Sequence, residues 1–232
     1  MIPALVNDEL DVLRQMVPLD HLNILELGCG AAKLARDLMR AHPGNQYTGL
    51  EVDLRQHAAN LTQPQEGMRF EVGVAQSIHL PDQSVDLVLM LKSLHHVPLD
   101  QMANALAETA RVLKPGGHLY VSEPVYDGAL NDIVRIYNDE GTVRAAAQAA
   151  VDQALAASNS PWVQVRESRF DMPVRFKSFE EFETRMMRPT FADHHLDDDK
   201  IARTRAAFLP HLKDDGAAFT RPMHVRLLQR RV

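Results

Sequence analysis

An acid followed by two glycines is the first pattern in this chain with a chemical consequence. Glu26 lies in the apolar run at 23–27, and Gly28 and Gly30 follow it directly. Glycine lets a chain turn sharply and lets a ligand approach the backbone without a Cβ in the way. A strand that ends in such a turn before a helix places free N–H groups at the carboxyl edge of a sheet, where α/β proteins bind ligands. The carboxylate suits a ligand that carries a positive amino group.

The glycine spacing differs from that of a dinucleotide-binding loop. The dinucleotide fingerprint is G-x-G-x-x-G, whereas Lys33 stands at the position of the third glycine here. The carboxylate of Glu26 would also repel a pyrophosphate. These two features disfavour a nicotinamide oxidoreductase.

Three side chains with acid–base chemistry accompany later apolar runs. His95 and His96 follow the run at 85–91, and Glu123 ends the run at 118–123. The carboxyl ends of parallel strands meet at one edge of a sheet, so a base for a bound substrate would lie there. A packing or capping role stays open for either histidine. Glu123 is equally suited to bind an amine of a substrate or to cap a helix.

Two further features have less specific interpretations. Cys29 stands beside a predicted helix N-terminus, which would stabilise a thiolate, but a small residue fitted into a tight loop is the favoured interpretation. The segment 193–199, DHHLDDD, offers metal-ligand types together with His95 and His96. A solvated charged loop explains that segment better, so no metal site is predicted.

Short apolar runs alternate with helix-period segments in the first half of the chain, as in βαβ units. Strands are predicted at 23–27, 46–52, 69–73, 85–91 and 118–123. Helices are predicted at 31–41, 55–62 and 100–112. The run at 85–91 is almost continuously apolar, which is typical of a central parallel strand. The pattern predicts an α/β fold with a doubly wound, mostly parallel sheet.

The rhythm changes in the second half of the chain, after about residue 125. We expect helical cap insertions at 125–160 and 174–212, a strand-like segment at 162–170 and an alternating final strand at 215–231. The alternation of the final strand predicts an exposed face that carries Arg221, Arg226, Arg230 and Arg231. At the other end, an N-terminal helix is predicted within 1–20. The whole chain, 1–232, is expected to form one domain.

Composition and charge limit the classes of function. Hydrophobic residues make up 45% and charged residues 24%, and the formal net charge of -6 argues against binding of nucleic acid. No apolar run approaches the roughly 18 residues of a membrane span, and the N-terminus lacks the pattern of a signal peptide. The single cysteine cannot form an internal disulfide. We therefore expect a cytoplasmic protein that binds neither membrane nor nucleic acid, with an oligomeric state that is not indicated.

Four segments, in order and spacing, resemble the class I S-adenosylmethionine (SAM)-dependent methyltransferases. LELGCG at 25–30 resembles the E-x-G-x-G pattern of motif I, and YTGLEVD at 47–53 resembles the second strand with its terminal acid. GVAQSIHLPDQSVDLVLMLKSLHHV and ARVLKPGGHLYVSEP resemble the third-to-fifth-strand region. The resemblance covers about residues 20–124 and is closest to the small-molecule group called type 11. It implies a Rossmann-like sheet of seven strands whose last strand is antiparallel.

The resemblance also implies a binding site for SAM along this loop. Glu26 would lie close to the amino group of SAM, and Gly28, Cys29 and Gly30 would pass under its methionine and ribose parts. Lys92 falls where family members often contact the methionine part by backbone.

A second acid is implied for the ribose. Glu51, followed by Val52, matches the acid that ends the second strand, and its two oxygens could bind both ribose hydroxyls. Asp53 is the alternative, although a role as the cap of the next helix suits it better.

The adenine site departs from the family pattern. Family members often have an aspartate where Val74 stands, so the partner for the adenine amino group is absent. Stacking on apolar groups, the backbone N–H of Ala75 or the side chain of Gln76 are the alternatives.

The resemblance predicts a SAM-dependent methyltransferase that acts on an oxygen or nitrogen of a small molecule. His95, Glu123 and His96 are the candidate catalytic residues. One alternative is a tRNA or protein methyltransferase, which would need a basic surface or docking module. The other is a SAM-binding protein without methyl transfer, for which Val74 leaves room. The acceptor is not indicated, because the second half of the chain carries no recognised motif.

Overall fold

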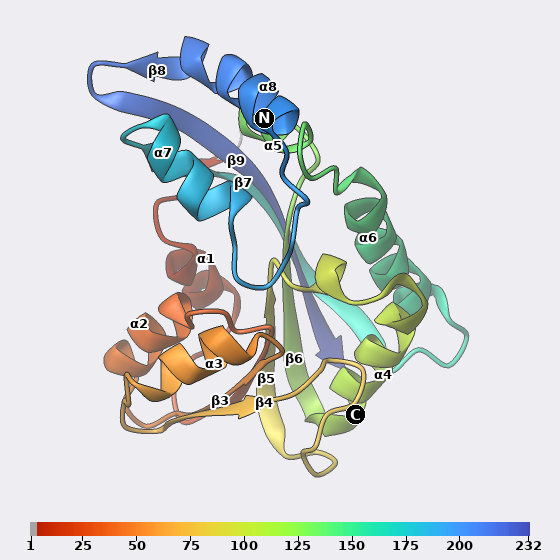
Figure 1. Cartoon of the computed structure of the whole chain (residues 1–232). Coiled ribbons are helices and arrows are strands. Elements are labelled where there is room, and N and C mark those ends of the chain that lie inside the picture. The colour runs from red at the N-terminus through yellow and green to blue at the C-terminus, as the bar shows by residue number, and fades with distance from the viewer. Residues whose placement is uncertain (1–3) are drawn as a thin grey trace.

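Strands from both halves of the chain form one twisted sheet (Figure 1). The computed structural model describes residues 4–232. Within these residues the sheet has nine strands in the order β1-β7-β9-β6-β5-β2-β3-β4, with β8 paired to β9. The strands are β1 (Ala4–Leu5), β2 (Asn23–Leu27), β3 (Gln46–Glu51), β4 (Met68–Val72), β5 (Val85–Leu91), β6 (Leu113–Pro124), β7 (Trp162–Phe176), β8 (Leu212–Lys213) and β9 (Gly216–Arg230).

The sheet confirms the predicted doubly wound topology. Strands β2 to β6 are parallel to their neighbours, and β9 lies antiparallel between β6 and β7. The seven predicted strands are present, and the short strands β1 and β8 extend the sheet. The centre of β5 is fully buried because helices cover both faces, which explains its continuous apolar run.

Helices pack on both faces of the sheet. The helices are α1 (Glu9–Met16), α2 (Lys33–Ala41), α3 (Leu54–Leu61), α4 (Met102–Val112), α5 (Ala129–Val134), α6 (Gly141–Ala156), α7 (Phe179–Phe182) and α8 (Asp198–Phe208). Figure 1 shows α1, α2 and α3 on one side of the sheet and α4 and α6 on the other. No helix among residues 4–232 is long and apolar enough to cross a membrane.

Two predicted boundaries are corrected by the structure. Of the helix predicted within 1–20, residues 1–3 lie outside the described part, Ala4–Leu5 form β1 and pair with β7, and only Glu9–Met16 are helical. The insertion predicted at 125–160 contains α6, which does not lie wholly over the carboxyl edge. Ala147 and Val151 of α6 join the core on the α4 face of the sheet, because an alanine-rich face packs closely against strands. The second insertion begins later than predicted, since β7 continues to Phe176.

A second cluster of apolar side chains holds the cap above the sheet. Residues of β9 before Pro222 pair with β7 but not with β6, so these two strands extend beyond the edge of the sheet. Phe176 and Phe219 project from this extension and pack against Phe182 of α7 and Phe208 of α8. Aromatic rings packed edge-to-face stabilise such a cluster beyond the area they bury. The extension therefore fixes α5, α7 and α8 over the carboxyl ends of the strands (Figure 1).

Candidate active site

The glycine loop between β2 and α2 turns where the sequence predicts it. Gly28 and Gly30 have φ angles of 69° and 49°, in the left-handed region that favours glycine. A Cβ on Gly28 would lie 2.9 Å from the Cβ of Ser93, so the loop also approaches the end of β5 closely. A Cβ on Gly30 would meet nothing within 4 Å. The loop therefore opens at Gly30 toward a space that a ligand can enter.

The backbone N–H groups of this loop are not free, contrary to the prediction. Those of Gly28 and Cys29 donate to the carbonyl of Leu50, at 2.9 and 3.0 Å, and that of Gly30 donates to Glu51 Oε2 at 2.7 Å. Buried backbone donors need partners, and the end of β3 supplies them. The thiol of Cys29 is buried, and burial raises its pKa far above the ordinary value, so it is not a reactive thiolate.

Glu51 ties the glycine loop to the end of β3. Its carboxylate is 6% exposed and accepts three backbone hydrogen bonds, from Gly30 and, at 2.9 Å each, from Val52 and Asp53. Asp53 instead caps α3, as the sequence predicts, and accepts from the N–H of Arg55 at 2.9 Å. Of the two acids, Glu51 is the one that faces the loop.

Glu26 is a buried carboxylate without a strong cationic partner. It is 3% exposed and accepts a hydrogen bond from the Tyr47 hydroxyl at 2.6 Å. Burial raises the pKa of Glu26 to about 7, although the hydrogen bond from Tyr47 opposes the shift. A positively charged ligand beside this carboxylate would restore its charge and gain a charge-assisted hydrogen bond.

A second buried acid, Glu9 at the start of α1, faces the same region. Lys92 Nζ lies 3.4 Å from Glu9 Oε2, and the Tyr120 hydroxyl donates to Glu9 Oε1 at 3.3 Å. Lys92 itself has a φ of 59°, and its N–H donates to the carbonyl of Ser122 at 2.7 Å. A ligand would therefore meet the carbonyl or the ammonium of Lys92, and not its N–H.

The predicted adenine-side residues lie just beyond β4. Val74, Ala75 and Gln76 are partly buried and form a tight turn in which Val74 bridges to Ser77. Val52, after β3, exposes 58% of its surface. This edge of the site is mainly apolar, in keeping with a flat ring held by packing and not by a carboxylate.

His95 and Glu123 form a buried pair at the carboxyl ends of β5 and β6. Both are less than 5% exposed, and His95 Nδ1 contacts Glu123 Oε2, whose other oxygen accepts from the N–H of Leu94 at 2.9 Å. An ionised carboxylate only accepts hydrogen bonds, so it holds the proton on Nδ1 and leaves the lone pair on Nε2. The pair thus has the arrangement of a base oriented by an acid.

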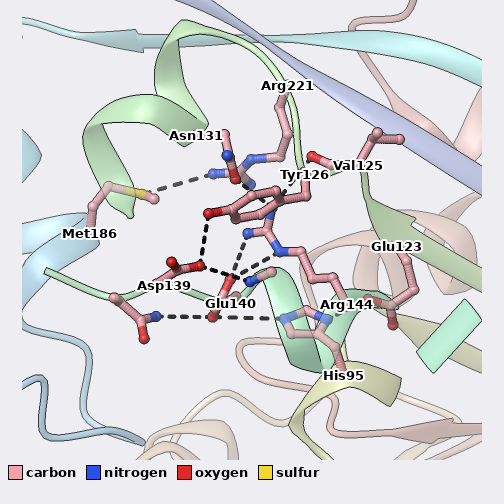
Figure 2. Close-up of polar contacts among 12 residues, drawn as sticks. His95, Glu123, Val125, Tyr126, Asn131, Asp139, Glu140, Arg144, Met186 and Arg221 are labelled. Atoms are coloured by element: carbon pink, nitrogen blue, oxygen red, sulfur yellow. Dashed lines mark hydrogen bonds and ion pairs between the residues drawn. The ribbon is translucent and has the colours of Figure 1, made fainter. Parts of the chain in front are cut away.

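Glu140 and Arg144, from the start of α6, complete this cluster. His95 lies between Glu123 and Glu140, with Nε2 3.9 Å from Glu140 Oε1 (Figure 2). Arg144 donates to Glu140 Oε2 at 2.5 and 3.1 Å and to Asn131 Oδ1 at 3.0 Å. Burial alone would raise the pKa of Glu140, but the neighbouring His95 and Arg144 outweigh it, so the pKa lies below the ordinary value.

The same cluster has the spacing of a metal site. One ligand atom from each of His95, His96 and Glu140 lies within 4.8 Å of the others. However, Arg144 already neutralises the one carboxylate of this set, and a cation would have to bind beside its guanidinium. Electrostatics therefore favour proton transfer over metal binding here. In DHHLDDD, His195 pairs with Asp193 on the surface.

A cavity of about 220 Å³ lies between this cluster and the cap. Its lining includes Lys92 and His95 from the sheet edge, Tyr137 and Arg144 from the cap, and Arg221 from β9. The cavity is thus continuous with the predicted catalytic residues.

The segment after α7 spans the two parts of the site. The Thr190 hydroxyl donates to the carboxylate of Asp53, at the start of α3. Phe191 packs on His96, with ring centroids 5.4 Å apart, and lines the cavity. These contacts place the segment across both the glycine-loop side and the cavity side.

Comparison with known proteins identifies the central part of this fold. Residues 25–121, a little under half of the chain, match the family model described as a methyltransferase domain. The matched span contains the glycine loop, Glu51 and His95. The chain contains a class I methyltransferase domain. The methyl donor of this family is S-adenosyl-L-methionine.

Curated relatives of the methyltransferase domain act on lipids according to their names. One is a fatty-acid O-methyltransferase of Mycolicibacterium smegmatis, 37% identical over 109 residues, which are 45% of this chain and 38% of that protein. Another is a phthiotriol/phenolphthiotriol dimycocerosates methyltransferase of Mycobacterium leprae, 38% identical over 107 residues, which are 44% of this chain and 38% of that protein. The chain thus spans well under half the length of these relatives.

Solved structures share the fold of the methyltransferase domain over nearly the whole chain. The YcgJ protein of Bacillus subtilis superposes with a TM-score of 0.63 at 20% identity, over 97% of this chain and 98% of that one. The [4+2]-cyclase SpnF superposes with a TM-score of 0.58 at 21% identity, over 96% of this chain and 80% of that one. The fold is therefore shared by proteins whose titles describe different chemistry.

The cap and the N-terminal helix supply side chains that sequence reasoning missed. Glu9, Glu140, Arg144 and Thr190 lie outside the segments that resemble the methyltransferase family. The break at NDEG, 138–141, marks the start of α6 and is the one local signal near Glu140. The alternation of β9 indicated an exposed Arg221, whereas the structure places it in the cavity.

Proposed function

We propose that this protein transfers a methyl group from SAM to an oxygen or nitrogen of a small molecule. The observation that carries the proposal is the position of the buried His95–Glu123 pair, which lines a small cavity beside the glycine loop. A base at that place is needed for an acceptor that must lose a proton when it is methylated.

The residues around the loop suit SAM. The open space at Gly30 leaves room for the ligand backbone, and the buried Glu26 lacks the cation that an α-amino group would supply. Glu51 has two oxygens beside the loop, which suits a ribose diol. We assign Glu26 to the amino group and Glu51 to the ribose.

The chemistry asks for alignment and for removal of one proton. When bound, SAM supplies a methyl group on a sulfonium: a lone pair of the acceptor forms the new bond to carbon while the C–S bond breaks, and its electron pair stays on sulfur. His95 Nε2 takes the proton of the acceptor, Glu123 holds the ring in the required tautomer, and Glu140 stabilises the imidazolium that results.

A small acceptor is supported by the enclosure of the cavity and by the curated relatives. The cap covers the site with α5, α6 and the segment 188–197, which restricts access for a large polymer. The relatives named for fatty acids and phthiotriols act on small, non-polymeric molecules according to their names. The net charge of -6 adds no support for an RNA acceptor.

The first experiment is a calorimetric titration with S-adenosylhomocysteine, with NADH as the control ligand. We expect a dissociation constant on the order of micromolar for S-adenosylhomocysteine and no detectable heat with NADH. Binding of NADH alone would overturn the cofactor assignment. After binding is shown, SAM consumption with a panel of small hydroxyl and amine compounds tests methyl transfer.

Replacing Glu51 with glutamine should weaken the binding of S-adenosylhomocysteine by about tenfold or more, because a charged acceptor of ribose hydroxyls becomes neutral. The matched control is Asp53→Asn, which changes the neighbouring acid and retains an oxygen to cap α3. We expect less than about a threefold change in the control. Equal losses in the two variants, measured by calorimetry, would remove the assignment of the ribose to Glu51.

A SAM-binding protein without methyl transfer is the second candidate. The observation in its favour is Val74, which leaves the adenine side without the acid of the family pattern. In that case S-adenosylhomocysteine would bind, and SAM would not be consumed with any acceptor in the panel.

A further inference from the structure

The cavity contains an arginine whose charge is not balanced. Arg221 lies on the part of β9 that extends beyond the sheet, where it pairs with Met172 of β7. Its closest polar contact is with Met186 Sδ, 3.9 Å from Nη2 (Figure 2). Across residues 4–232, no carboxylate lies within 4.0 Å of its guanidinium nitrogens. A thioether is a weak acceptor, so the guanidinium retains nearly all of its hydrogen-bonding capacity.

The other arginines of the cavity differ from Arg221. Arg144 is held by Glu140, and Arg185 is held by Glu181 at 2.8 Å and lies over the ring of Phe176. Burial, together with the charge of Arg144, lowers the pKa of Arg221 below its ordinary value. A partly buried cation beside a second cation is unfavourable unless an anion joins them. An anionic ligand group would supply that partner.

The anion and the methyl-accepting atom are two different groups. Arg221 and the His95–Glu123 pair line the same cavity but come from different elements, β9 and the ends of β5 and β6. A carboxylate has no proton to lose at neutral pH, so a carboxylate acceptor would leave the His95–Glu123 pair without a role. An acceptor with a hydroxyl or amine would use that pair.

We infer that the acceptor carries a carboxylate that binds to Arg221, in addition to the hydroxyl or amine that faces His95. A guanidinium offers two parallel N–H groups to the two oxygens of a carboxylate, and one arginine is enough for that pairing. The inference rests on the proposed function for the identity of the reacting group. The carboxylate site itself stands on the geometry of Arg221.

Fluorine NMR titration with para-fluorobenzoate and its neutral amide, para-fluorobenzamide, tests the site. Both probes are added to the chain with and without S-adenosylhomocysteine. We expect the benzoate to bind at least about tenfold more tightly than the amide, because only the benzoate forms the charged pair. Equal affinity of the two probes, or binding of neither, would overturn the inference.

Two variants with matched side chains assign the effect to one residue. In Arg221→Met the preference for the benzoate should disappear, whereas Arg185→Met, which removes an arginine already paired with Glu181, should retain it. Arg221→Met should also raise Tm, because it removes an unbalanced charge, whereas a purely structural arginine would lower Tm when lost. A preference that persists in Arg221→Met would contradict the assignment.

The same titrations separate this inference from the proposed function. Binding of S-adenosylhomocysteine is measured by calorimetry on each variant and should be unchanged within about threefold. If the unmodified chain bound no S-adenosylhomocysteine, the proposed function would fail. The benzoate preference without S-adenosylhomocysteine would still decide the carboxylate site.

Discussion

Replacing Glu26 with glutamine should weaken the binding of S-adenosylhomocysteine at pH 8 by about 30- to 100-fold. A buried charge-assisted hydrogen bond to the ligand ammonium would be lost, which is worth roughly 2–3 kcal/mol. The amide keeps an oxygen for the Tyr47 hydroxyl, so the local packing is preserved. Calorimetry measures the loss. The control is Glu71→Gln on β4, which removes a carboxylate of the same type outside the loop and should bind normally. A fully retained affinity in Glu26→Gln would refute the amino-group assignment.

The pH dependence of binding gives an independent test of Glu26. Its pKa of about 7 in the free protein means that part of the carboxyl is protonated at neutral pH. Only the carboxylate pairs with an ammonium, so affinity should fall by up to about tenfold per pH unit below 7. In Glu26→Gln this dependence should vanish. An equally steep dependence in the variant would assign it to another group.

The same variant should be more stable than the unmodified chain in the absence of ligand. The folded chain holds the proton of Glu26 up to about pH 7, whereas the unfolded chain releases it near 4.5. A raised pKa in a carboxyl destabilises the folded state, increasingly from pH 4.5 to 7 and fully above 7, by at most about 3 kcal/mol. At pH 8 the glutamine should therefore raise Tm by roughly 5 °C, and at pH 4 it should not.

Replacing His95 with alanine should lower kcat by about 100- to 1,000-fold with the acceptor that the panel identifies. The variant loses the base that takes the acceptor proton, while the glycine loop and Glu51 are unchanged. The affinity for S-adenosylhomocysteine should stay within about threefold, because His95 lies on the cavity side. The measurement is initial rates together with calorimetry.

The neighbouring histidine provides the matched control. His96 lies in the same short 3₁₀ helix, but it is exposed and has no partner equivalent to Glu123 among residues 4–232. We expect His96→Ala to retain most of kcat. Glu123→Gln should lower kcat and shift the pH profile, because the amide no longer fixes the tautomer of His95. Loss of activity in His96→Ala with normal activity in His95→Ala would exchange the two roles.

Local patterns in the sequence were sufficient for the sheet and the glycine loop. The bounds of the strands at 23–27 and 85–91 agree with the structure, because an apolar run flanked by polar residues is typical of a buried parallel strand. The positive φ angles of Gly28 and Gly30 follow from the absence of a Cβ. The capping role of Asp53 follows from its position before α3.

The partners of these residues were decided by strands and helices far apart in the sequence. The sequence predicted free N–H groups in the loop, but Leu50 and Glu51 of β3 accept them, because β3 lies beside β2 in the sheet. It placed His95 and Glu123 at one edge without showing that they would bond. Parallel pairing of β5 with β6 brings them together.

The arginines of β9 show the limit of a strand pattern most directly. Alternation tells which side chains share a face of a strand, but it does not tell what covers that face. Arg226 was expected on an exposed face, yet it is 7% exposed and pairs with Asp152 of α6 at 2.7 Å. Arg221 faces the cavity because β9 extends beyond the sheet and the cap folds over it. The sequence by itself thus determined the strands, the loop and the donor-binding acids, since these depend on local spacing. Only the tertiary structure decided which charges face the acceptor cavity, since that depends on how the helices between 125 and 212 pack over β9.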